Sequence, residues 1–121
     1  MARRARLDVV LDCANAMALM PFWRDALGYR VHFAEGPLAV LVAPEGTASP
    51  LVLQQVPEPK TGKNRMHIDI TTDDVEGDVT RLEGLGATRT HDGVQSFGGT
   101  RWVTMADPEG NEFCVCDGVE W

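Results

Sequence analysis

The segment LDVVLDCANAMALMPFWRDALGYRVHF, residues 7–33, decides which fold we expect for this chain. Residues 7–12 alternate apolar and acidic side chains, as a strand does when its two faces meet different environments. Residues 16–27 carry apolar side chains at helical spacing, and Gly28 follows where a glycine commonly ends a helix. We therefore expect a strand and then a helix of about three turns. The stripe of this helix expected to pack in the core consists of Met17, Met20, Trp23 and Leu27.

Three further strands are expected after this helix, which makes the first half of the chain β-α-β-β-β. They are residues 29–33, 37–42 and 51–56, separated by turn segments at 35–36 and 44–46. Residues 57–65 then form an extended linker, because Pro57 and Pro59 deny this polar stretch a helix. The first module thus covers about residues 1–56.

The second half of the chain repeats this order of elements. We expect strands and a helix, in chain order, at 66–71, 74–85 (the helix, followed by Gly86), 87–90, 101–106 and 112–117. This repeat predicts an α+β fold of two tandem βαβββ modules, with residues 1–121 as one domain and module 2 covering about 66–121. The two modules are expected to form a curved mixed sheet around a groove, with the helices on the faces away from the groove.

The composition excludes several classes of function. With 44% hydrophobic and 24% charged residues, the 121-residue chain has the composition of an ordinary globular protein. Its net charge of −7 opposes a polyanionic partner, so we expect no nucleic acid. The basic cluster Arg3, Arg4 and Arg6 is followed by no long apolar segment, so we expect no signal peptide and no membrane anchor. Three cysteines without C-x-x-C spacing favour a reduced, cytoplasmic chain.

The alternation of side chains along the strands predicts which of them face the groove. The members expected in the core are Met66, Ile68, Ile70, Phe113 and Val115. The members expected to face the groove are His67, Asp69, Thr71, Trp102, Thr104, Cys114 and Cys116.

Several of these residues have both a functional and a structural interpretation. His67 is an acid or base whose ring Asp69 orients, or a structural histidine bonded within the sheet. Cys114 is a metal ligand or a small buried hydrophobic residue. Trp102 is a pocket wall for planar ligands or part of a subunit interface. Asp8 is a metal ligand, or it lies in a wet groove or pairs with Arg65 or Arg101.

Two segments outside the strands also leave alternatives open. The glycine-containing residues 97–100 either let a loop close over a ligand or form a plain hairpin connection. The basic side chains of the linker, Lys60, Lys63 and Arg65, either attract an anionic substrate or solvate a loop.

Three motifs resemble a known family. Residues 22–29, FWRDALGY, look like the end of its first helix, and residues 107–113, DPEGNEF, look like its DP-[DE]-GN turn. Residues 63–69, KNRMHID, resemble its glyoxalase-like subgroup. Over nearly its whole length the chain is therefore similar to the glyoxalase/bleomycin resistance/dioxygenase (vicinal oxygen chelate, VOC) superfamily. The resemblance implies the glyoxalase/bleomycin resistance fold, a small-molecule ligand in the groove and a homodimer.

The resemblance also implies positions for a metal ion. Metal-binding members hold a divalent ion with His, Gln and Glu side chains, and these positions fall on Asp8, Gln54, His67 and Cys114. One imidazole is kept and the usual carboxylate is lost. Asp8, His67 and Cys114 would form an oxygen, nitrogen and sulfur set that zinc accepts. We expect a chain without a metal, with bound Zn or Ni as the alternative.

Two function classes follow from this comparison, and a third has weaker support. The first is a lyase or isomerase that moves a proton with help from a metal or from His67. The second is a non-catalytic protein that sequesters a small ligand, with Asp8, Gln54, Asp69, Trp102 and Cys114 as candidate ligand-binding residues. The third is a structural module that binds a partner. The terminal residues Val119, Glu120 and Trp121 are a candidate anchor for a subunit interface.

Overall fold

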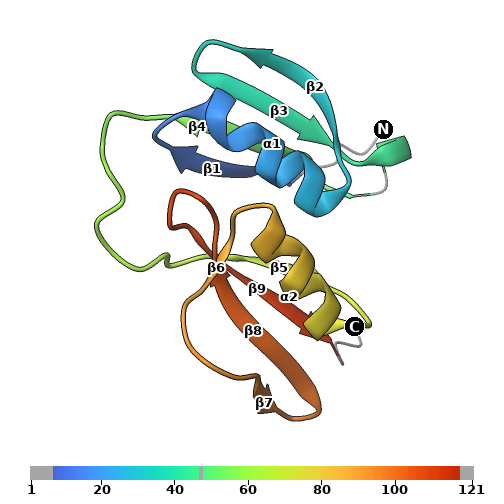
Figure 1. Cartoon of the computed structure of the whole chain (residues 1–121). Helices are drawn as coiled ribbons and strands as arrows, with labels where there is room; N and C mark the ends of the chain where they lie inside the picture. Colours follow the sequence, from blue (N-terminus) through green and yellow to red (C-terminus); the bar gives the residue numbers. More distant parts are fainter. Residues whose placement is uncertain (1–6, 47, 118–121) are drawn as a thin grey trace, which may run out of the picture. The chain divides into compact units, whose positions relative to one another are not determined.

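A computed structural model describes residues 7–46 and 48–117 of the chain. The chain divides into two compact units, Met1–Pro59 and Lys60–Trp121, each built on one sheet and one helix (Figure 1). The basic cluster at Arg3, Arg4 and Arg6 and the terminal Val119–Trp121 segment lie outside the described residues. Among the described residues, no helix is long and apolar enough to cross a membrane.

The N-terminal unit has the order β-α-β-β-β. Its elements are β1 (Val9–Cys13), α1 (Ala16–Leu27), β2 (Arg30–Glu35), β3 (Leu38–Val42), a short 3₁₀ helix (Pro44–Gly46) and β4 (Leu51–Gln55). The strand order in the sheet is β1-β4-β3-β2, with β1 parallel to β4 and the other pairs antiparallel. All four expected strands and the helix are present.

Local signals at both ends of α1 explain its bounds, which match the sequence prediction. The side-chain oxygen of Asn15 accepts a hydrogen bond from the N–H of Ala18 at 3.1 Å, which satisfies one free donor of the first turn. Gly28 adopts a left-handed conformation with φ of 68°, which glycine reaches without a steric cost.

The predicted core stripe of α1 is partly wrong. Trp23 is buried, but Met17, Met20 and Leu27 are only half-buried. The buried residues of the helix are Ala16, Leu19, Phe22, Trp23 and Ala26. The alanines have no bulk beyond Cβ and let the helix lie close to β3 and β4, whereas the prediction followed the largest side chains.

The C-terminal unit repeats this topology with one added strand. Its elements are β5 (Ile68–Thr71), α2 (Val75–Gly84), β6 (Thr88–Arg89), β7 (Gln95–Phe97), β8 (Thr100–Ala106) and β9 (Glu112–Asp117). The strand order is β5-β9-β8-β6, with β7 paired to β8 and β5 parallel to β9. The chain is therefore a mixed α+β protein with two helices, as predicted. Its strands form two sheets, of four and five strands, and the additional strand β7 was not predicted.

One prediction for this unit is wrong in detail, and one pair of alternatives is decided. The strand β5 begins at Ile68, and the side chain of Met66, which was expected in the core, is 86% exposed. Residues 97–100 form the β7–β8 hairpin connection, in which Phe97 pairs with Thr100 across Gly98 and Gly99. Both glycines have positive φ, as a two-residue hairpin loop requires, so this segment is a connection in the sheet.

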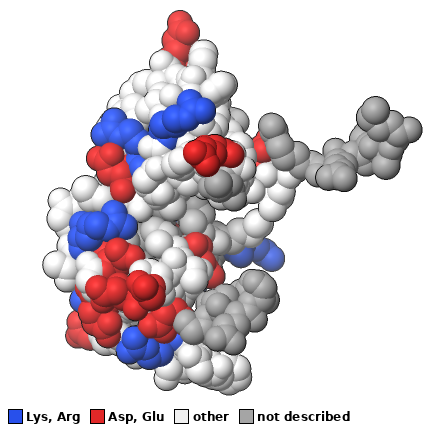
Figure 2. Space-filling view, turned by 90° about the vertical axis from the view of Figure 1, so that its right-hand side faces the viewer, with Lys and Arg blue, Asp and Glu red and all other residues white. Residues whose placement is uncertain are grey.

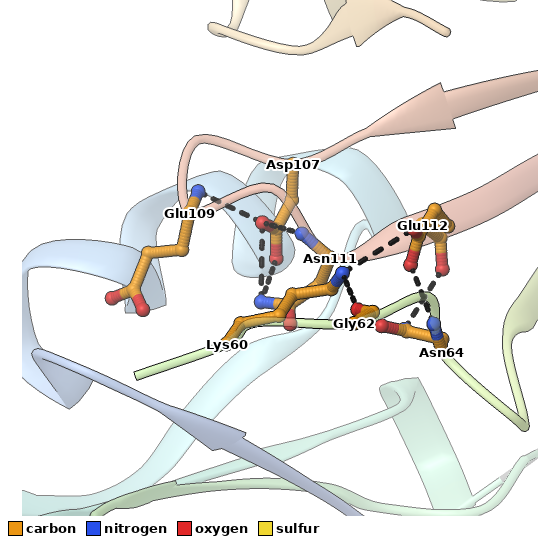
Figure 3. Close-up of polar contacts among 7 residues, drawn as sticks. All are labelled: Lys60, Gly62, Asn64, Asp107, Glu109, Asn111 and Glu112. Carbon is orange, nitrogen blue, oxygen red and sulfur yellow. Dashed lines mark hydrogen bonds and ion pairs between the residues drawn. The ribbon is translucent and has the colours of Figure 1, made fainter. Parts of the chain in front are cut away.

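The turn between β8 and β9 is held by the side chain of Asp107 (Figure 3). Its Oδ1 accepts hydrogen bonds from the backbone N–H of Glu109 at 2.8 Å and of Asn111 at 2.9 Å. The Nδ2 of Asn111 donates to Oδ2 of Asp107 at 3.0 Å. Because both polar side chains are buried, this pairing removes the cost of an unsatisfied group. The turn fixes where β9 starts.

Alternation along β8 and β9 separates a core face from an open face. Val103 and Met105 on β8, with Phe113 and Val115 on β9, are fully buried, and α2 contacts both strands. The open face therefore belongs to the side chains between them.

Candidate functional site

The open face of the C-terminal sheet carries a hollow of about 310 Å³. The loop before β5 and β5 itself supply Lys63, His67 and Asp69 to its lining. The strand β8 supplies Thr100, Trp102 and Thr104, and β9 supplies Cys114 and Cys116. The alternation of side chains along the strands predicts all of these residues on this face except Lys63 and Thr100.

The register of the strands explains which of these side chains meet. Asp69 on β5 is paired with Cys114 on β9, and Cys114 is paired with Thr104 on β8. Directly opposite residues on one sheet face have their Cβ atoms close enough for side-chain contact. One row across the sheet thus brings a carboxylate, a thiol and a hydroxyl together.

His67 and Asp69 form a close polar contact in the lining of the hollow. Nδ1 of His67 lies 3.0 Å from Oδ1 of Asp69, and the two side chains are 41% and 51% exposed. A carboxylate that accepts the Nδ1 proton fixes the tautomer of the ring and leaves Nε2 as the proton acceptor. The arrangement has the geometry that the sequence analysis proposed for an oriented acid or base.

The two cysteines of the hollow are buried and protonated at neutral pH. Burial raises the pKa of the Cys114 thiol, and the hydroxyl of Thr104, with its Oγ1 at 3.5 Å from the sulfur, lowers the pKa by less. Burial likewise raises the pKa of Cys116, whose Sγ donates to the carbonyl oxygen of Ile70 at 3.8 Å. A thiol with a raised pKa is a poor nucleophile, so neither cysteine acts as one by itself.

Three side chains have donor atoms placed for a metal ion. The ligand atoms of His67, Asp69 and Cys114 all lie within 4.8 Å of one another. The set predicted from the resemblance was Asp8, His67 and Cys114. The structure brings two of these three together and adds Asp69. Asp8 and Gln54 belong to the N-terminal unit, where both side chains are exposed.

Glu112 is a residue of this region that the sequence analysis missed. Its Oε2 accepts a hydrogen bond from the N–H of Asn64 at 3.0 Å, and its Oε1 pairs with Lys60 Nζ at 3.3 Å (Figure 3). Burial raises the pKa of this carboxyl, but the hydrogen bonds from Asn64 and Lys60 outweigh burial and hold it below its ordinary value. The contact joins β9 to the loop that carries Lys63.

The geometry defines a class of protein: two units that share the β-α-β-β-β order, the second with one added strand and with a small-molecule-sized hollow on its open sheet face. Residues 8–116 match the family described as Glyoxalase-like domain. This match covers most of the chain, and the chain therefore belongs to the glyoxalase-like domain family of the VOC superfamily.

Solved structures support the same fold. A glyoxalase/bleomycin resistance protein/dioxygenase family enzyme from Burkholderia phytofirmans PsJN is similar with a TM-score of 0.77 at 15% identity, covering 92% of this chain and 96% of that chain. Lactoylglutathione lyase from Agrobacterium tumefaciens has a TM-score of 0.69 at 23% identity over 98% of this chain and 96% of that chain. The protein described as oxidase ChaP-H2 has a TM-score of 0.64 at 19% identity, with 97% and 96% covered. No curated protein matches the sequence. A lyase and an oxidase share this fold, so the fold does not decide the reaction.

Proposed function

We propose that this chain binds a small molecule in the hollow of its C-terminal unit and that His67 moves a proton on the bound molecule, as a lyase or isomerase does. The observation that carries the proposal is the 3.0 Å contact between His67 Nδ1 and Asp69 Oδ1 in the lining of the hollow. An oriented imidazole is the most common general acid or base at neutral pH. The volume of about 310 Å³ is at the lower end of the range for ligand sites, which suits a ligand of about one ring.

The donor set of the hollow fits a borderline divalent ion such as zinc or nickel. His67, Asp69 and Cys114 would supply nitrogen, oxygen and sulfur, and their ligand atoms are within 4.8 Å of one another. Zinc takes these three ligand types and keeps a fourth position for water or substrate. When bound, such an ion supplies Lewis-acid polarisation of a substrate oxygen. In such a metal-loaded site His67 would hold the ion, so its role as the proton acceptor belongs to the metal-free protein.

The second candidate function is sequestration of a ligand without chemistry. Trp102 lines the hollow, and the raised pKa values of Cys114 and Cys116 keep both thiols neutral. An aromatic wall beside neutral side chains suits a flat, weakly polar compound. In this second function the His67–Asp69 pair would stabilise the edge strand β5 and would move no proton.

Three broader features belong to the same proposal. The two units act as one glyoxalase-like domain with limits near residues 1–56 and 66–121, which the near-complete coverage of the similar solved structures supports. The chain forms a homodimer, and it works in the cytoplasm, where its free cysteines stay reduced. A monomeric mass in solution at high micromolar concentration would argue against the dimer.

Proton exchange separates the two functions. We expect protein purified without added metal to catalyse deuterium uptake beside the carbonyl group of small aldehydes and ketones in D₂O, followed by proton NMR. The exchange rate should fall by about a hundredfold or more in His67→Ala, as loss of a general base does, and should stay unchanged in the control His32→Ala. His32 is an exposed histidine on β2.

The outcomes of this experiment are distinct. Carbonyl compounds that shift the NMR signals of the hollow without any exchange above buffer would indicate sequestration. Elemental analysis of the same preparation tests the metal: zinc or nickel near one ion per chain, reduced in Asp69→Asn and Cys114→Ser, is the expected result for a metal-loaded site. If His67→Ala leaves a measured exchange rate unchanged, the catalytic role of His67 is wrong.

A further inference from the structure

The hollow carries one basic side chain in a strongly acidic protein. The chain has a net charge of −7, and Figure 2 shows acidic side chains gathered over the C-terminal unit. Of the side chains that line the hollow, Lys63 is the only lysine or arginine. Across residues 7–46 and 48–117, Lys60 pairs with Glu112, whereas no ion pair involves Lys63. The ammonium group of Lys63 is therefore available to a ligand.

The backbone on both sides of Lys63 is tied down. The carbonyl oxygen of Gly62 accepts a hydrogen bond from Lys60 Nζ, and the N–H of Asn64 donates to Glu112 at 3.0 Å (Figure 3). The Nδ2 of Asn64 also donates to the backbone oxygen of Glu112 at 3.4 Å. A lysine between two anchored residues loses less freedom on binding than a lysine on a free loop. Glu112 is thus a positioning residue for Lys63.

The rest of the lining restricts the shape and charge of a ligand. Trp102 supplies a flat aromatic surface on β8, and the hydroxyls of Thr100 and Thr104 lie on the same strand face. Asp69 adds a negative charge to the same lining, which penalises a second negative charge on the ligand. The combination favours one negative charge on a flat body.

We propose that the hollow is selective for planar monoanions, whose carboxylate or enolate Lys63 binds while the flat body lies against Trp102. This selectivity rests on the proposed function, because it needs the hollow to be the ligand site. Lysine is a compact point charge, so it holds either kind of oxyanion without demanding a two-pronged geometry.

The test compares three probes of similar size on the full-length protein: benzoate, benzamide and cyclohexanecarboxylate. Binding is followed by the indole N–H signal of Trp102 in NMR spectra, assigned with Trp102→Phe. Benzoate should bind about tenfold more tightly than benzamide, the effect of one hydrogen bond to a charged group. Benzoate should also bind several-fold more tightly than cyclohexanecarboxylate, as aromatic contacts predict.

Variants assign the preference to Lys63. Lys63→Met should make benzoate and benzamide bind equally, and Lys63→Arg should keep the preference. Arg65→Met, which removes the same charge two residues away and outside the lining, is the matched control and should keep the preference. Glu112→Gln should weaken benzoate binding by a smaller factor than Lys63→Met does and should leave benzamide binding unchanged. A general loss of structure would weaken the binding of both probes.

Each outcome decides between the two proposals. The selectivity would be overturned if the wild-type protein bound benzoate and benzamide equally. It would also be overturned if Lys63→Met and Arg65→Met weakened benzoate binding equally. In both cases the hollow would remain a ligand site. If none of the three probes shifts the Trp102 signal, the hollow is not a ligand site, and the proposed function fails with the selectivity.

Discussion

Burial decides what Cys114 can do. It raises the pKa of the thiol, the contact with Thr104 lowers the pKa by less, and the negative charge of Asp69 raises it further. The side chain is only 7% exposed, although it lines the hollow. Because the thiolate is the reactive form, this cysteine is inert at neutral pH unless a metal displaces its proton.

We expect iodoacetamide to leave Cys114 unmodified in the native protein at pH 7 and to alkylate it only at a pH above the ordinary thiol pKa. Thr104→Val removes the hydroxyl that lowers the pKa, so alkylation should begin at a still higher pH. Mass spectrometry of peptides measures the modified fraction, with glutathione in the same sample as the reactive control. Alkylation of Cys114 as fast as that of glutathione at pH 7 would contradict the burial argument.

The sequence predicted the faces of the site residues better than their contacts. Alternation placed His67, Asp69, Trp102 and Cys114 on one face because the side-chain period of a strand is two. It did not predict the row that joins Asp69 to Cys114, since a row depends on the register between strands far apart in sequence. The Lys60–Glu112 pair was missed for the same reason, as no local pattern links these two positions.

At the scale of elements, the packing of α1 depends on its small residues. Ala16 and Ala26 are buried on the face that packs against the sheet. The edge-to-face contact of Phe22 and Trp23, with ring centroids 5.1 Å apart, fills the space beside them. A larger side chain at Ala26 would have to displace the helix or its neighbours.

Ala26→Leu is therefore expected to lower the free energy of unfolding by about 1–3 kcal/mol, the usual cost of overpacking a core. The matched control is Ala18→Leu, an exposed position on the same helix, where a change within about 0.5 kcal/mol is expected. Urea denaturation at pH 7 measures both. A stability of Ala26→Leu equal to that of the control would mean that the helix does not lie as close to the sheet as described.

Long elements were easier to predict than short ones. The bounds of α1 and β9 were predicted to the residue because capping residues, a turn and a clear periodicity agree there. The three-residue strand β7 was not predicted, because so short a strand shows no period. The strand predicted at residues 87–90 was found, but β6 covers only Thr88–Arg89. Met66 continues the apolar alternation of β5 in sequence, but the strand starts after it.

At the scale of the whole molecule, carboxylates paired in the folded state control the response to acid. The hydrogen bond from Arg101, at 2.7 Å, holds the pKa of Asp117 below its ordinary value. The hydrogen bond from Arg24 likewise lowers the pKa of Asp25. The hydrogen bonds from Asn64 and Lys60 lower the pKa of Glu112. Such groups stabilise the folded chain above their unfolded pKa values, near 4, and the stabilisation is lost as the pH falls through the folded values.

We expect the urea midpoint to be nearly constant between about pH 7 and pH 5 and to fall steeply below about pH 4, where these carboxylates take up protons. Arg101→Met removes the partner of Asp117, so its midpoint should start lower at pH 7 and fall less than the wild-type midpoint between pH 5 and pH 3. Arg65→Met, which removes an equal charge from the loop, should follow the wild-type slope. The pairing of Asp117 would have no part in acid stability if Arg101→Met and Arg65→Met showed the same fall. A smaller fall in Arg101→Met alone would assign that part of the acid response to the ion pairs of Arg101 with Asp117 and Glu76, since both variants change the net charge of −7 equally.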